Sequence, residues 1–123
     1  MITLQRRISN DALATTCLST VAVGTIVTWN SSGVIVPANE NSTTVQVVVA
    51  KKSPTECFIQ GSGAHVKTTL FSAQPIGTRL ILGASGIPVP ATEGYDGIFW
   101  PVGTVVPNGF IFEPETLPVL LRD

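Results

Sequence analysis

The stretch from residue 77 to residue 114 constrains the fold more than any other part of the sequence. Its short apolar runs are bounded by glycine and proline: Gly77–Gly83, Gly86–Pro90, Gly97–Pro101, Gly103–Pro107 and Gly109–Pro114. Both residue types weaken the interior of a helix or strand but suit the turns between elements. The spacing therefore predicts strands of only a few residues joined by tight turns, with almost no residue that can do chemistry.

From residue 19 onward the pattern indicates further strands. We expect them over residues 19–23, 25–30, 34–36, 44–50, 56–60, 64–71 and 79–82, with a last edge strand over residues 117–121. In the run Thr44–Ala50, Val45, Val47 and Val49 share one face. Because Val48 occupies the other face, this strand is expected to be covered on both sides. The turns expected within hairpins are Asn30–Gly33 and Pro107–Gly109.

The first 18 residues differ from the rest. Residues 2–8 alternate as an extended segment, which is either a sheet edge or an arm that reaches a neighbour. Residues 9–18 are the one helical candidate, although the β-branched pair Thr15–Thr16 weakens it. We therefore expect an N-terminal arm with a short helix or turn over residues 1–18 and a single β domain over residues 19–123. The expected fold class is mainly β, a small β-barrel or β-tulip with at most one short helix.

Composition limits the possible partners. The chain is 44% hydrophobic and only 12% charged, with a formal net charge of −1. Such a sparsely charged surface favours association with copies of the chain or with another protein. The sequence contains neither a basic face interleaved with aromatics nor an apolar run of about 18 residues, so we expect neither nucleic-acid nor membrane binding. The N-terminus has no apolar region typical of a signal peptide, which favours the cytosol or a particle assembled there.

Few side chains are candidates for a catalytic or ligand site. His65 and Ser85 carry no nucleophile signature, and each is interpreted as a strand or turn residue. Glu113 and Glu115 could bind a cation, but Pro114 between them favours a solvated edge. Exposed aromatics could instead form a carbohydrate platform, namely Trp29, Tyr95, Phe99 and Trp100. We expect no enzyme activity, no cofactor and no metal.

The two cysteines lack the spacing of a metal site. Cys17 and Cys57 are expected to stay reduced in a cytosolic protein, with a disulfide between them left open as the alternative.

Three segments carry a resemblance to a known family. Residues 76–90 (IGTRLILGASGIPVP), 100–106 (WPVGTVV) and 109–114 (GFIFEP) resemble a recurring pattern in small tailed-bacteriophage proteins. The pattern is glycine-bounded short strands with a proline-rich spacer, and it looks most like the head decoration, or cement, proteins. Related segments occur in head and tail fibres. The likeness covers about the last third of the chain.

The resemblance implies a compact β subunit that binds the outer surface of an icosahedral head as a homotrimer. It further implies the major capsid protein as partner and the virion as the location, after assembly in the host cytoplasm. An extended arm could add a strand to a capsid-protein sheet, so the expected partner-binding residues are Ile2, Thr3, Leu4, Gln5 and Arg6. The alternative function is a fibre module that binds a receptor or glycan, and a small hydrolase is the third hypothesis.

Overall fold

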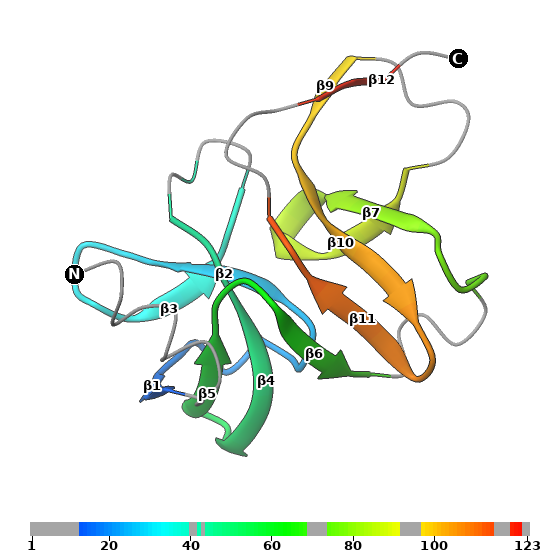
Figure 1. Cartoon of the computed structure of the whole chain (residues 1–123). Helices are drawn as coiled ribbons and strands as arrows, with labels where there is room; N and C mark the ends of the chain where they lie inside the picture. Colours follow the sequence, from blue (N-terminus) through cyan, green and yellow to red (C-terminus); the bar gives the residue numbers. More distant parts are fainter. Residues whose placement is uncertain are drawn as a thin grey trace.

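A computed structural model describes residues 13–39, 42, 44–68, 74–91, 97–114 and 119–121. The described chain is mainly β and forms two five-stranded antiparallel sheets and one two-stranded ribbon (Figure 1). A three-residue helical turn, η1, spans Ala84–Gly86. The prediction of a mainly β fold with very little helix is therefore confirmed.

The N-terminal sheet contains the first five strands. Its order is β1 (Leu13–Thr16), β5 (Glu56–Gln60), β4 (Gln46–Ser53), β2 (Ile26–Trp29) and β3 (Ile35–Pro37).

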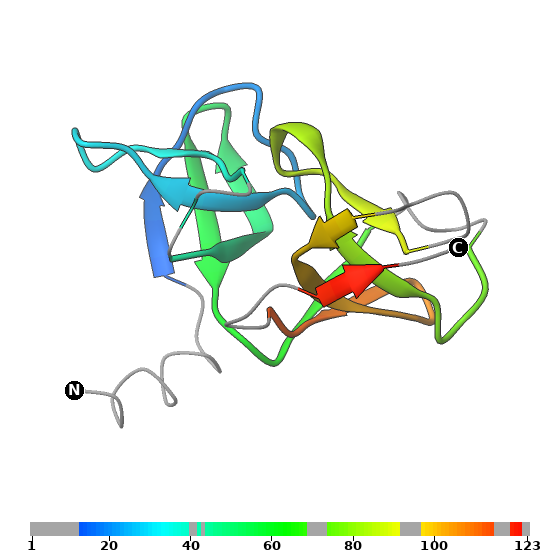
Figure 2. The same ribbon diagram turned by 90° about the horizontal axis from the view of Figure 1, so that it is seen from above.

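The C-terminal sheet follows in the chain and lies beside the N-terminal sheet (Figure 2). Its order is β6 (Ala64–Lys67), β11 (Gly109–Phe112), β10 (Pro101–Val106), β7 (Arg79–Leu82) and β8 (Pro88–Pro90). The ribbon pairs β9 (Gly97–Phe99) with β12 (Val119–Leu121), so a final strand forms as expected from the run after residue 117.

The two sheets bury a common set of side chains, which we call the central core. The N-terminal sheet and the residue after β3 contribute Ile26, Val47 and Ala38, and the C-terminal sheet contributes most of the remainder. All members are nearly inaccessible to solvent: Ile26, Ala38, Val47, Ala64, Val66, Leu80, Val102, Val105, Phe110 and Phe112. The contact between the sheets therefore holds the domain together through apolar burial.

A second apolar cluster, the outer core, lies on the opposite face of the N-terminal sheet. It consists of Cys17, Val21, Val27, Ile35, Val48, Cys57 and Ile59. Neighbouring residues on β4, Val47 and Val48, are both 0% exposed although they point to opposite faces. The expectation that this strand is covered on both sides is confirmed, and Ile26 and Val27 show the same arrangement on β2.

The N-terminal sheet curls without closing. Cys17, just after β1, forms a single parallel bridge with Ile35 of β3 at the opposite edge of the sheet, and the Leu18 N–H donates to the Ile35 carbonyl at 3.1 Å. One bridge does not continue into a ladder, so the described strands form two open sheets rather than a closed barrel. The small β domain expected from the sequence is confirmed, but the closed barrel that was one of its expected forms is not present among the described strands.

The helix expected over residues 9–18 is wrong where the structure describes it. Residues 13–16 form β1, which pairs with β5 in the register Leu13↔Ile59 to Thr16↔Glu56. The β-branched Thr15 and Thr16 prefer a pleated surface, and the pairing supplies the hydrogen bonds that a helix would have provided. Residues 9–12 lie outside the described part.

The strand expected over residues 19–23 is also absent. This segment is a loop with turns at Ser19–Thr20 and Val23–Gly24, and Val21 in its middle is buried in the outer core. The segment covers the outer face of the N-terminal sheet instead of pairing within it. The strand prediction for residues 19–23 was wrong because a loop that covers a sheet can be as apolar as a strand.

Lys51 on β4 holds this covering loop in place. Its Nζ donates to the Val21 carbonyl at 2.7 Å, to the Pro54 carbonyl at 3.1 Å and more weakly to the Ser19 carbonyl at 3.4 Å. An ammonium group has three donors, so one side chain satisfies carbonyls from two separate segments. Charge-assisted bonds of this kind are stronger than neutral ones.

Both expected hairpin turns are confirmed. The Asn30 side-chain oxygen accepts hydrogen bonds from the N–H groups of Ser32 at 2.9 Å and Val34 at 3.0 Å, which closes the turn between β2 and β3. Between β10 and β11, Val106 pairs with Gly109 across a two-residue loop in which Asn108 has a φ of 67°. Asparagine tolerates this left-handed conformation well.

We predict that Lys51→Met destabilises the fold while Lys52→Met does not. Methionine retains the apolar stem but leaves the Val21 and Pro54 carbonyls without the ammonium donor, at an expected cost of about 1–3 kcal/mol. Lys52 is the adjacent, exposed lysine on β4 and serves as the matched control. Urea unfolding of both variants measures the difference, and equal stability of the two would refute this role of Lys51.

Candidate functional site

The predicted partner-binding residues Ile2 to Arg6 lie outside the described residues. The described chain begins at Leu13, which is the first residue of β1. Among the described residues, β1 is an edge strand of the N-terminal sheet and pairs along its length with β5. In the sequence, the segment that contains Ile2–Arg6 therefore precedes an edge strand, and this edge is a candidate binding surface.

Three of the four edges of the two five-stranded sheets carry features that hinder the addition of another strand. β8 begins and ends with Pro88 and Pro90, which lack an N–H. β6 presents the exposed side chains of His65 and Lys67. β3 ends in Pro37 and is already bonded to the chain after β1. Prolines, charges and covering segments are the usual means by which proteins protect sheet edges.

The fourth of these edges, β1, has neither prolines nor charges, and β3 meets it only at its C-terminal end. Its sequence, Leu-Ala-Thr-Thr, contains no charge and no proline, and three of its four residues are exposed. Leu13 is 49% exposed, and Leu18 just beyond the strand is 44% exposed. An unprotected edge beside exposed apolar side chains is a template for pairing with another strand.

The hydrogen-bond register identifies the free backbone groups of β1. The Cys17 N–H donates to the Thr55 carbonyl at 2.9 Å, so the backbone of every second residue back along β1 faces β5. The groups of Ala14 and Thr16 then face away from β5. Among the described residues nothing pairs with the Ala14 groups, whereas the Thr16 carbonyl faces Ile35 of β3 at the Cys17–Ile35 bridge.

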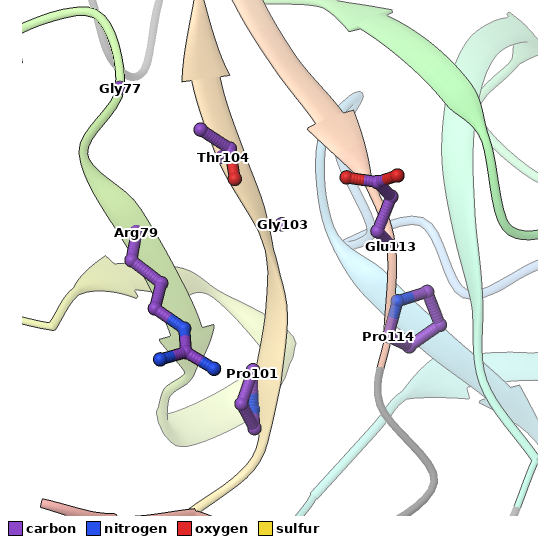
Figure 3. Close-up of a pocket in the computed structure, with 7 residues that line it drawn as sticks. All are labelled: Gly77, Arg79, Pro101, Gly103, Thr104, Glu113 and Pro114. Carbon is purple, nitrogen blue, oxygen red and sulfur yellow. The ribbon is translucent and has the colours of Figure 1, made fainter.

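A shallow hollow of about 440 Å³ lies on the C-terminal sheet (Figure 3). Its polar side chains come from three strands or their ends: Arg79 of β7, Thr104 of β10 and Glu113 just after β11. In Figure 3 the Arg79 guanidinium extends toward Pro101, whereas the Glu113 carboxylate lies on the other side of β10. The two charged groups therefore do not converge on one point.

A second hollow of about 630 Å³ lies between β4 and β6. It is lined by Ala22, Val23, Val49, Ala50, Lys51, Lys67 and Thr68. Neither hollow brings together a nucleophile and a general base, which hydrolytic chemistry requires.

The residues considered for catalysis take the positions expected of strand and turn residues. His65 is exposed on β6 opposite Ile111, next to the corner formed by residues 61–63. Ser85 is an exposed residue of η1 with a φ of 56°. Glu113 is exposed, and Glu115 lies outside the described residues.

The expected aromatic platform is only partly described. Trp29 ends β2 of the N-terminal sheet and is 37% exposed. Trp100 lies between β9 and β10, so these two residues belong to different sheets. Tyr95 and the side chain of Phe99 lie outside the described part.

Cys17 and Cys57 are both free thiols buried in the outer core. Burial first, and then the hydrogen bond that the Cys57 thiol donates to the Cys17 sulfur, raises the pKa of Cys57 to about 12. The Lys51 ammonium acts in the opposite direction, since it favours the thiolate. Sequence spacing could not have indicated this contact, because 39 residues separate the two cysteines.

No family model, curated protein or solved structure matches this chain. In the described segments, no group of three or more metal-ligating side chains comes together. The helical content described is too short to cross a membrane.

We predict that Cys57 makes the protein less stable at alkaline pH. Below about pH 9 the thiol is protonated in both the folded and the unfolded state and contributes nothing to the pH dependence. Between about 9 and 12 only the unfolded thiol ionises, so the free energy of unfolding falls as pH rises.

Urea unfolding under reducing conditions measures this effect. The free energy of unfolding of the native chain should fall faster with pH than that of Cys57→Ala, by at most about 1.4 kcal/mol per pH unit. Lysines and tyrosines contribute equally to the pH dependence of both proteins, so their contribution cancels when the slope of the native chain is compared with that of Cys57→Ala. Parallel pH profiles would show that the folded thiol ionises normally.

Proposed function

We propose that this chain is a structural virion protein, a capsid decoration or cement protein that binds the outer surface of an icosahedral phage head as a homotrimer. The observation that carries the proposal is the unprotected β1 edge, which follows directly on the segment containing Ile2–Arg6. The resemblance of residues 76–90, 100–106 and 109–114 to the decoration proteins agrees with it.

The proposed contact uses the backbone more than the side chains. Residues 2–6 and β1 together form one N-terminal segment to which a strand of the major capsid protein can add. The outward groups of Ala14 supply hydrogen bonds, and Leu13 and Leu18 supply apolar area at about 25 cal/mol per Å² buried. Strand addition needs little sequence specificity, which fits a segment as plain as Leu-Ala-Thr-Thr.

The proposed effect on the shell follows from selective binding. A trimer that contacts several capsid subunits at once binds the assembled, mature shell and not its dissociated parts. A ligand that binds one state stabilises that state by mass action. The sparse charge of the chain, 12% of its residues, lowers the electrostatic cost of packing copies together.

The first prediction from this proposal is the molecular mass in solution. Light scattering coupled to size exclusion should give close to three times the 12.9 kDa mass of the chain at micromolar concentration. A monomer at that concentration would favour the fibre-module alternative. In that case a glycan array would test binding through exposed aromatics such as Trp29.

The second prediction concerns the β1 edge. Ala14→Pro removes an outward N–H without removing a bond to β5, so the variant should fold but attach to phage heads at least about tenfold more weakly. Ala14→Val keeps the N–H and is the matched control. Binding is measured by co-sedimentation with heads of the encoding phage that lack this protein, and thermal unfolding checks the fold.

Full attachment of a folded Ala14→Pro variant would show that β1 is not the contact. Deletion of residues 1–8 separates the arm from the strand. Loss of attachment on deletion alone would assign binding to Ile2–Arg6, and loss with both changes would assign it to the whole N-terminal segment.

A further inference from the structure

The chain contains two cysteines, and the fold brings them together although neither belongs to the proposed binding edge. Cys17 follows β1, and Cys57 lies on β5, the strand with which β1 pairs. They are 2% and 1% exposed, respectively. Both side chains belong to the outer core, on the same face of the N-terminal sheet, and the nearby Cys17 helps to raise the pKa of the Cys57 thiol.

The strand register places the pair on a diagonal of the sheet. Thr15 is directly opposite Cys57, and the Cys17 N–H bonds to the carbonyl of Thr55. Diagonal partners have Cα atoms about 7–8 Å apart in a regular sheet, and disulfides span up to about 7 Å. Only a small closing movement of Cys17 toward Cys57 is therefore needed.

We propose that Cys17 and Cys57 form a reversible intramolecular disulfide when the protein meets a low-molecular-weight disulfide such as oxidised glutathione. The new bond fastens the chain after β1 to β5. Because these are the two cysteines of the chain, no other intramolecular pairing competes. The inference concerns the fold itself and stands whether or not the chain is a capsid protein.

The reaction is a two-step thiol–disulfide exchange. One cysteine, as thiolate, attacks a sulfur of oxidised glutathione, which forms a mixed disulfide and releases one glutathione thiolate that takes up a proton. The second cysteine loses its proton and attacks the cysteine sulfur of the mixed disulfide, which expels the second glutathione. Overall, two protein thiols are oxidised by two electrons, and one glutathione disulfide is reduced to two thiols.

Burial controls the rate of this exchange. Glutathione cannot reach thiols that are 1–2% exposed, so the reaction requires β1 to separate locally from β5. β1 can do so because it has a single neighbouring strand and mostly exposed side chains. The disulfide, once formed, restricts that separation and so holds the start of the N-terminal sheet in place.

Oxidation of the purified native chain tests the proposal. Reduced protein is incubated with oxidised glutathione, alkylated to block remaining thiols, and analysed by intact mass and by peptide mapping without reduction. The expected product is a monomer whose mass is lower than that of the reduced chain by two hydrogens and which carries no alkyl group. Its peptide map should contain two peptides joined by a disulfide between Cys17 and Cys57.

The thermal midpoint supplies a second, independent readout. Closing a loop of about 40 residues should raise Tm by roughly 10 °C, and dithiothreitol should reverse the rise. Cys17→Ala, treated identically, should gain no such stability and should acquire at most one glutathione at Cys57. Two alkylatable thiols after prolonged oxidation would overturn the proposal, as would a stable glutathione adduct or an intermolecular dimer of the native chain.

Discussion

The fold depends on the burial of both faces of the N-terminal sheet. Val47 and Val48 are consecutive on β4 and point to opposite sides, yet neither has accessible surface. A sheet of this kind cannot stand alone, because each face exposes apolar area that must be covered. The C-terminal sheet covers one face through the central core, and the chain over residues 17–24 covers the other. Every other feature of the domain accommodates that requirement.

The loop that covers the outer face of the N-terminal sheet takes part in two polar interactions, one with Lys51 and one between the two cysteines. Backbone bonds fix the two ends of this loop, at Leu18 and Gly24, and Lys51 anchors its middle by bonding the Val21 carbonyl as well as the Pro54 carbonyl. The same loop carries Cys17 to Cys57. Both thiols are thereby shielded from solvent, and the pKa of Cys57 rises to about 12. The hydrogen bonds of Lys51 and the proximity of Cys17 to Cys57 thus both result from the packing of this loop on the outer face.

The proposed function follows from how the sheet edges differ. Prolines limit β8, and charged or titratable side chains limit β6, whereas β1 has neither. Among the four edges of the two five-stranded sheets, the β1 edge is therefore the one suited to strand addition.

The sequence by itself determined the mainly β class, the turns at Asn30–Gly33 and Pro107–Gly109, and the double burial of β4. These features are local, because turn residues and side-chain alternation act over a few positions. The tertiary structure decided that residues 13–16 form an edge strand, that residues 19–23 are a covering loop, and that the sheets stay open. It also decided the meeting of Cys17 with Cys57. Each of these features depends on which segments, distant in the sequence, pack against one another. Local sequence patterns do not specify that pairing.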